Sequence, residues 1–434
     1  MADWMRLDNA ALIFPAVRRK DWSNAFRVSA DLTERVDPAI LQQAVNDLMP
    51  RFPSMYVSLH RGAFWYYLQK LEQPPQVRPD GACPLIHMTR QEVRRCCLRV
   101  LYYENRIAVE CFHVLTDGTG GMVYLKSLTA RYLTLKYGIP QDSGFGVLSP
   151  IDAPSPSELE DSFSRAAGPV SMSRKEENSI RLGGTREPDA FLHLTVASIP
   201  EAQLLELAHQ YGCSVTAFLG GVMLQTIMEL SQGRQRGRWA KVTIPVDLRR
   251  LFGGDTMRNF VLTVNVGVDP RLGSYTLREL CSAVQSQLTT QVTPQQMAAR
   301  IAANVVPARL YPVRILPLPL KNLALKLVYR SVGESKGSIN ISNLGKSRLP
   351  EDLMPYVRHL DFIIGPQATY FNNCSVVSYG GTTRINLIRS IREPNLERCF
   401  LTRLVELGLS VRVDSNERSD GRVLHELRRE AGRG

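Results

Sequence analysis

A histidine, an aspartate and three glycines lie between two apolar segments of this 434-residue chain, in the stretch AVECFHVLTDGTGGMVYLKSL. An unperturbed imidazole has a pKa near ~6.5, so His113 can take a proton from a hydroxyl, amine or thiol near neutral pH. Asp117, four residues later, can cap the helix that follows or pair with a cation. Gly118, Gly120 and the glycine after it permit a tight turn or a close approach by another group. The same residue types also suit an ordinary polar turn, in which His113 is only a hydrogen-bonded strand-end residue.

The neighbouring residues predict a strand that ends at His113 and a helix that begins after the glycines. The strand closes a hairpin that turns at Glu104 and Asn105, and the helix stops at Gly138. Alternation and helical periodicity predict the other elements of the first half, which are a strand at 23–32, a helix at 37–52 capped by Asp37, and two strands within 54–69.

The character of the chain changes at residues 141–189, which are rich in Ser, Pro, Gly and charged residues and have little periodicity. This composition is typical of a crossover linker. We therefore expect two subdomains, at 1–140 and 190–434, on either side of it. Periodicity in the second predicts strands near 190–199, 240–249, 259–268, 337–345, 357–365, 374–381 and 382–390, and helices at 200–212, 214–230, within 276–331 and at 395–408. This alternation predicts a mixed α/β fold with two sheets.

The overall composition limits the possible partners. The formal net charge of +12 attracts anions, but the basic residues are scattered and form no nucleic-acid-binding signature. A phosphorylated small molecule or an acidic carrier is therefore favoured over nucleic acid. The eight cysteines form no Cys-x-x-Cys pair, so no metal site is expected. With no signal-peptide pattern and no apolar run of ~18 residues, we expect a cytoplasmic protein.

Several segments resemble one known family. The stretch FHVLTDGTGG resembles the His-x-x-x-Asp-Gly motif of acyltransferases with the chloramphenicol acetyltransferase fold. These include nonribosomal-peptide condensation domains, plant acyl-CoA-dependent acyltransferases, polyketide-associated acyltransferases and bacterial alcohol acetyltransferases. LTVASIPEAQLLELAHQYG, IPVDLRRLFGGDTMRNFV and ISNLG resemble later segments of that family, in the same order. The resemblance covers nearly the whole chain and implies two chloramphenicol acetyltransferase-like subdomains with mixed sheets and a channel between them.

The resemblance also implies roles for individual residues. His113 would be the general base that deprotonates an alcohol or amine acceptor for attack on a thioester. Asp117 and Gly118 would shape the loop, with Asp117 paired to Arg249 or, one residue later, Arg250. The donor would be an acyl-CoA, or an acyl group on the pantetheine of a carrier protein, and no tightly bound cofactor or metal would be needed.

The sequence leaves the oxyanion donor open among Ser342, Asn343, Tyr379 and backbone amides near Gly120. Phe112 stands where condensation domains usually carry a first histidine, which favours an acyl-CoA-dependent alcohol or amine acyltransferase. A condensation-like domain with a carrier-bound donor and a non-catalytic binding relative remain alternatives.

Two apolar segments allow a second interpretation. PVRILPLPLKNLALKLVYRSVG has leucines and lysines that suit a basic amphipathic surface helix, but we expect it to pack on the domain with its lysines solvated. GAFWYYLQ is likewise expected in a sheet core. Peripheral membrane contact is therefore not expected from the sequence.

Overall fold

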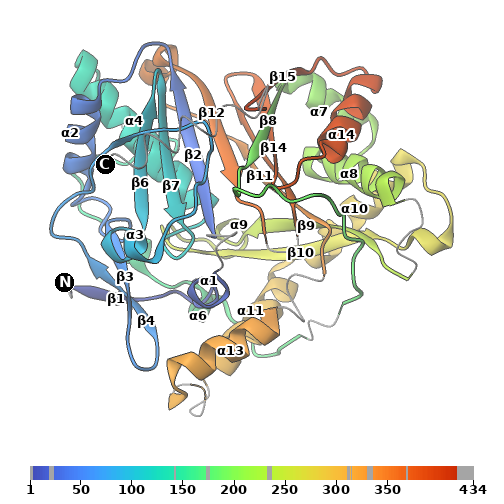
Figure 1. The fold of residues 1–434 in the computed structure, drawn as a ribbon, viewed down its shortest axis with the longest axis horizontal. Coiled ribbons are helices and arrows are strands. Elements are labelled where there is room, and N and C mark those ends of the chain that lie inside the picture. The colour runs from blue at the N-terminus through green and yellow to red at the C-terminus, as the bar shows by residue number, and fades with distance from the viewer. Residues whose placement is uncertain are drawn as a thin grey trace.

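The computed structural model describes residues 3–18, 24–140, 143–172, 176–231, 237–309, 313, 315–329, 336–367 and 370–417. Figure 1 shows two sheet-rich halves side by side, with helices covering the sheets. The predicted mixed α/β fold is confirmed.

The first half contains a five-stranded sheet and a small three-stranded one. The larger has the order β12 (Val357–Ile364), β2 (Ala25–Leu32), β7 (Arg106–Phe112), β6 (Leu98–Tyr103), β5 (Arg78–Pro79). The smaller has the order β1 (Trp4–Arg6), β4 (Tyr66–Lys70), β3 (Val57–Arg61). The helices here are α1 (Phe14–Val17), α2 (Pro38–Leu48), α3 (Arg90–Arg95) and α4 (Gly118–Tyr137), with a 3-10 helix η3 (Glu351–Tyr356) beside them.

Local sequence signals explain the two main helices of this half. Asp37 caps α2 by accepting from the amides of the following turn, and the apolar face that begins at Leu41 is buried. Asp117 caps α4, which ends at Gly138 in the left-handed conformation with φ 71°. The helix that follows the candidate histidine thus ends where the sequence predicts, but it begins at Gly118 and includes the glycines after which it was expected to start.

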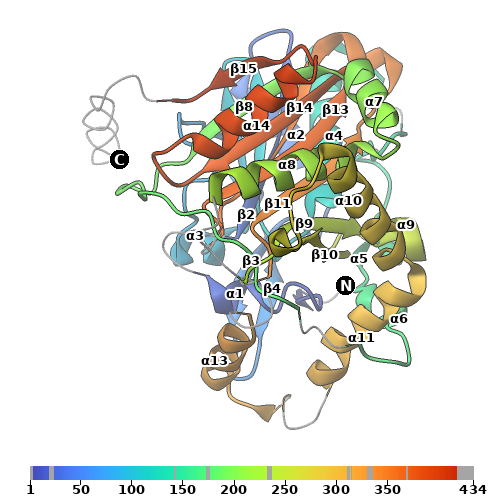
Figure 2. The ribbon, with the colours of Figure 1, turned by 90° about the vertical axis from the view of Figure 1, so that its right-hand side faces the viewer.

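The second half contains a seven-stranded mixed sheet. Its order is β10 (Val261–Val268), β9 (Ala240–Asp247), β11 (Ile339–Lys346), β13 (Asn372–Tyr379), β14 (Thr382–Arg389), β8 (His193–Pro200), β15 (Arg412–Ser415). The helices are α7 (Glu201–Gln210), α8 (Val215–Ser231), α9 (Arg249–Phe252), α10 (Leu277–Gln291), α11 (Pro294–Arg309), α13 (Leu318–Val328) and α14 (Asn395–Glu406), with the 3-10 helix η1 (Pro270–Leu272). Figure 2 shows α8 and α14 lying across this sheet.

Among the described residues, no single helix is long and apolar enough to cross a membrane, although α7 and α8, bent by 76° at their junction, pass the length and composition criteria as a pair.

One strand of the second half completes the sheet of the first. β12 pairs antiparallel with β2, and its Leu360 and Phe362 belong to the first hydrophobic core. That residues 141–189 separate two subdomains stays a prediction. The sheets do not follow this boundary, because a strand from beyond residue 189 belongs to the sheet of the first half. The two halves share a strand.

The segment predicted as a linker packs on both halves. It carries the short helices α5 (Pro156–Leu159) and α6 (Phe163–Ala166). Glu158 receives two hydrogen bonds from Arg51 of the first half, at 2.5 and 2.9 Å. Phe163 is fully buried in the core of the second half. Within its described part, this segment therefore fastens the halves together.

The structure corrects part of what was expected for the two apolar segments, although α13 does pack on the domain through the buried Leu318 and leaves Lys326 exposed. The helix α13 lies at the periphery and leaves Leu320, Leu323 and Leu327 more than half exposed. At the tip of the β3–β4 hairpin, Phe64 and Trp65 are also exposed rather than part of a sheet core. The reason is position, because both elements project beyond the two main sheets (Figure 1).

Candidate active site

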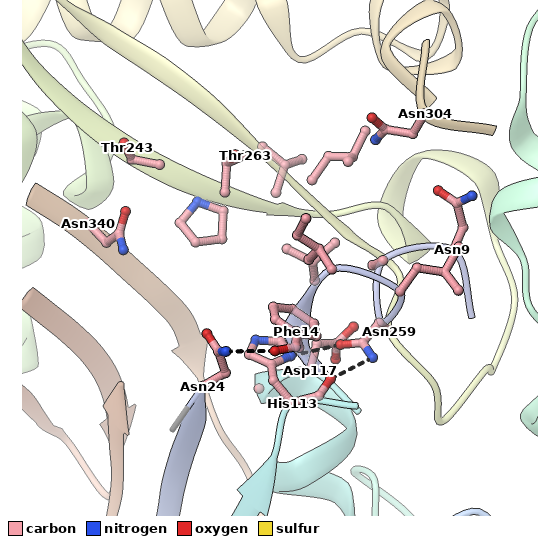
Figure 3. Close-up of a pocket in the computed structure, with 18 of the residues that line it drawn as sticks. Asn9, Phe14, Asn24, His113, Asp117, Thr243, Asn259, Thr263, Asn304 and Asn340 are labelled. Atoms are coloured by element: carbon pink, nitrogen blue, oxygen red, sulfur yellow. Dashed lines mark hydrogen bonds between the residues drawn. The ribbon is translucent and has the colours of Figure 1, made fainter. Parts of the chain in front are cut away.

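His113 follows β7 at the junction of the two halves. Its backbone amide donates to the carbonyl of Asn24, just before β2, at 2.9 Å. Phe14 stacks on the imidazole with ring centres 4.5 Å apart, and Phe26 meets it edge-on at 5.2 Å. The half-buried ring is thus fixed between two aromatic side chains at the wall of a cavity (Figure 3).

The side chain of Asn259, from the second half, determines which imidazole nitrogen carries the proton. Its Nδ2 donates to Asp8 Oδ2 at 3.0 Å and to the His113 carbonyl at 2.9 Å, so its Oδ1 is the acceptor. This Oδ1 lies 2.9 Å from Nδ1 of His113 (Figure 3). In the neutral ring Nδ1 is therefore protonated, and Nε2 keeps the lone pair that a general base requires.

The surroundings also favour the neutral form of this ring. Burial lowers the pKa of His113 below its usual value, because desolvation penalises the imidazolium. The Asp117 charge and the Asn259 hydrogen bond act in the opposite direction but do not cancel this effect. At neutral pH the imidazole is ready to accept a proton.

Asp8 supports Asn259 from behind. It is fully buried, accepts from the Ala11 amide at 2.7 Å, and lies 3.7 Å from Nε of Arg258. Burial raises the pKa of Asp8 to about 6, opposed by the Arg258 charge and the Asn259 hydrogen bond. His113, Asn259 and Asp8 form a continuous line of hydrogen bonds that joins both halves to the N-terminal segment.

Asp117 faces away from the imidazole and links the loop to the second half. Its Oδ2 accepts hydrogen bonds from Nη1 of Arg249 at 2.9 Å and from the backbone amide of Phe260 at 2.8 Å. Its Oδ1 accepts a hydrogen bond from the backbone amide of Gly120 at 3.1 Å. Arg249 also donates to Asp247 at 2.9 Å. The structure thus brings Asp117 together with Arg249, whereas Arg250 is exposed. Both partners are buried, which makes the loop conformation depend on this pair.

The glycines after Asp117 are needed for close contact with protein side chains. A Cβ on Gly118 would lie 2.8 Å from the ring of Phe362, and one on Gly121 would lie 2.6 Å from the ring of Phe26. A Cβ on Gly120 would collide with the hydroxyl of Thr116 at 2.0 Å. The first turn of α4 can approach β2 and β12 only with glycine at these positions.

The cavity beside His113 has a volume of about 1310 Å³ and lies between the halves. Its walls come from the N-terminal segment, β9, β10, β11, α11 and α13. Thr243, Thr263, Asn304 and Asn340 place hydroxyl and amide groups on its walls away from the imidazole (Figure 3). This volume exceeds that of an ordinary small-ligand pocket, so it has room for two substrates at once.

The candidate oxyanion donors do not all reach this cavity. Ser342 and Asn343 line it, but the Asn343 amide is engaged with Thr216 and Gly345. Tyr379 lies in the first hydrophobic core and outside the cavity wall. The Gly120 amide donates to Asp117. Ser342 is therefore the side chain that we retain. Tyr379 is rejected on position, and the Gly120 amide is rejected because its hydrogen bond goes to Asp117.

Sequence reasoning missed Asn259, Asp8 and Phe14. Asn259 lies in the segment IPVDLRRLFGGDTMRNFV that the resemblance singled out, so its position was a usable signal. Asp8 and Phe14 lie in the N-terminal segment, whose short strand and four-residue helix leave no periodic pattern. Within the described ranges, no group of three or more His, Cys, Asp or Glu side chains could hold a metal ion.

Comparison with known proteins places this geometry in a fold. No protein-family model and no curated protein matches the chain. Polyketide synthase associated protein 5 from Mycobacterium tuberculosis is similar over 92% of this chain and 96% of its own, with 14% identity and a TM-score of 0.60. F. graminearum TRI101, solved with coenzyme A and T-2 mycotoxin, is similar over 94% of this chain and 100% of its own, with 12% identity and a TM-score of 0.62.

A domain of a peptide synthetase has the same architecture. The epimerization domain from the third module of tyrocidine synthetase B is similar over 89% of this chain and 91% of its own, with 11% identity and a TM-score of 0.55. These likenesses show a chloramphenicol acetyltransferase-like fold, which confirms the fold implied by the sequence resemblance. At these identities they show the fold alone.

Proposed function

We propose that this protein is an acyltransferase that moves an acyl group from an acyl-CoA thioester to an alcohol or amine acceptor. The observation that carries the proposal is the state of His113, a desolvated imidazole at the cavity wall whose Nδ1 proton is held by Asn259, so that the lone pair is on Nε2. A neutral histidine fixed in one tautomer at the wall of a two-substrate cavity suits general-base catalysis.

In this mechanism Nε2 of His113 takes the proton of the acceptor as its oxygen or nitrogen attacks the thioester carbonyl. The carbon–sulfur bond then breaks, and the thiolate leaves with the proton that His113 returns. The intermediate carries an oxyanion, for which the Ser342 hydroxyl is our candidate donor. Asn259 and the Asp117–Arg249 pair position the base and do not react.

An anionic donor suits the charge of the chain. Coenzyme A carries phosphates, and the net charge of +12 attracts it. The exposed Arg250 lies at the cavity wall beside Gly345, and Gly345 follows Ser342 by three residues in the chain. F. graminearum TRI101 is a protein of this fold that was solved with coenzyme A, which makes an acyl-CoA the first donor to test.

The test is thiol release from acetyl-CoA and longer acyl-CoAs with a panel of alcohols and amines. Acceptor-dependent release should fall about 100-fold or more in His113→Ala, the usual range for loss of a general base. His209→Ala, on the exposed side of α7 and outside the cavity, is the matched control and should keep full activity. Release that survives in His113→Ala would reject His113 as the base. Release only from acyl-carrier thioesters would favour the condensation-like alternative.

A further inference from the structure

The helix α13 presents apolar side chains on two opposite sides. Leu318 and Leu325 face the cavity and line it. Leu320, Leu323 and Leu327 lie at spacings of three and four residues, so they form one stripe on the other side. Their exposed fractions are 54%, 55% and 59%. A soluble helix that packs on a domain usually turns a polar face outward, and this one does not.

The tip of the β3–β4 hairpin extends this apolar surface. Leu318 donates its amide to the Ala63 carbonyl at 2.9 Å, and the Lys321 ammonium donates to the Phe64 carbonyl at 2.7 Å. The Asn322 amide reaches the Tyr66 hydroxyl at 3.0 Å. These bonds hold the exposed rings of the tip beside α13, and both elements project from the same end of the molecule (Figure 1). We call Phe64, Trp65, Leu320, Leu323 and Leu327 the rim patch.

Basic residues lie beside the rim patch, in a part of the sequence that is itself basic. Residues 291–350 contain nine Lys or Arg residues and one acidic residue, Glu334. Lys326 lies on the exposed surface of α13, and both Arg6 and Lys321 place their cations about 6 Å from the Trp65 ring. Leucines and tryptophan flanked by Lys and Arg are the composition of a surface that lies on an anionic bilayer.

We propose that the rim patch docks this protein on the surface of an anionic phospholipid bilayer. The apolar side chains enter the headgroup region, and the neighbouring cations of Arg6, Lys321 and Lys326 contact lipid phosphates. A second copy of the chain fits this surface poorly, because a symmetric contact would bring like charges together. The sequence-based expectation of no peripheral membrane contact is replaced by this proposal.

The position of the patch suggests what docking achieves. Trp65, Lys321 and Leu325 line the cavity that also contains His113, so its wall lies directly behind the docked surface. An apolar acceptor or a long acyl chain dissolved in the bilayer could enter there without crossing water. This consequence rests on the proposed acyltransferase function, whereas the docking itself does not.

Docking is tested by sedimentation of the full chain with phosphatidylcholine vesicles, with and without phosphatidylglycerol. We expect binding to the anionic vesicles that weakens with salt and is accompanied by a blue shift of tryptophan emission. The double variant Leu323→Glu/Leu327→Glu should bind at least about tenfold more weakly, because two exposed leucines that enter the bilayer on docking are replaced by anions. Leu205→Glu/Leu272→Glu, with exposed leucines of α7 and η1, is the matched control.

The outcomes separate docking from catalysis. His113→Ala should bind vesicles like the unchanged protein, and the rim double variant should keep its rate with short, water-soluble substrates. Equal vesicle binding by the rim variant and the control would overturn the proposal. So would an absence of binding to anionic vesicles, or a dimer in solution that the rim variant dissociates. Vesicle binding without any thioester turnover would reject the acyltransferase and leave the docking intact.

Discussion

The ring of His113 is subject to two opposing influences at the level of single residues. The aromatic walls of Phe14 and Phe26 exclude water and lower the pKa of the imidazole, whereas Asn259 and Asp117 stabilise its charged form. Because burial prevails, the imidazole stays neutral to a lower pH than that of a free histidine does. The pH dependence of the reaction can therefore report on the site directly.

The acidic limb of kcat/KM should lie below pH ~6.5 in the unchanged protein, because the proposed mechanism requires the neutral imidazole. Phe14→Ala admits water and should move that limb upward toward the ordinary value. Asn259→Ala removes a bond that favours the charged ring and should move it further down, while lowering kcat because Nδ1–H loses its acceptor. Both are measured as pH profiles of thiol release. A shift of the acidic limb in the same direction in both variants would contradict this account of the pKa of His113.

The buried pair of Asp117 and Arg249 should contribute strongly to stability. Asp117→Ala leaves Arg249 with Asp247 as its remaining carboxylate and deprives the amides of Gly120 and Phe260 of their acceptor. We expect a loss of about 3 kcal/mol in the free energy of unfolding, measured by urea titration. Arg250→Ala, at the exposed neighbour, should change it by less than about 0.5 kcal/mol. Similar values for the two variants would show that the pair is not structural.

Sequence reasoning could find the candidate histidine but not the residues that hold it. His113, Asp117 and Arg249 lie in segments with recognisable order and spacing, and the structure brings them into one site. Asn259 is 146 residues from His113 in the sequence, and Asp8 is 251 residues from Asn259, yet each pair is joined by a hydrogen bond. No local pattern encodes contacts of this range, because they depend on how the two halves meet.

At the level of elements, the start of α4 shows what the glycines do. The sequence indicated a tight turn or a close approach, and the structure supports the close approach, since these glycines lie within the helix from its first residue. The apolar face of α13 was harder to predict. Its leucines occupy two sides of the helix, so periodicity alone could not say which side faces solvent.

Gly121→Ala tests the close approach at the level of the helix. Its Cβ would lie 2.6 Å from the ring of Phe26, which is buried and touches the imidazole. We expect a destabilisation of about 1–3 kcal/mol in thermal unfolding, with a fall in kcat because the ring of His113 must shift. Gly183→Ala, where a Cβ meets nothing within 4 Å, should change neither quantity. An unchanged Gly121→Ala protein would mean that α4 can move away without affecting the site.

At the level of the whole molecule, the exchanged strand and the bridging ion pairs tie the two halves into one unit. The sequence predicted nearly every long strand and helix, because each carries its own periodicity. It could not predict that β12 would leave its own half, because a strand whose central residues are buried on both faces can pair at the edge of either sheet. Which sheet it joins is decided by the packing of Leu360 and Phe362 against β2 and α4.

The shared strand makes a prediction about unfolding of the complete chain. Phe362 is 2% exposed in the core of the first half, yet it belongs to the second half of the sequence. Calorimetry should therefore show one transition rather than two, and Phe362→Ala should lower the stability of that whole transition by about 3–5 kcal/mol. Met354→Ala, at an exposed side chain just before β12, is the control and should leave the transition in place. Two separate transitions, with only one responding to Phe362→Ala, would show that the halves fold as independent subdomains. The site would then form only after they dock, since His113 and Asn259 come from different halves.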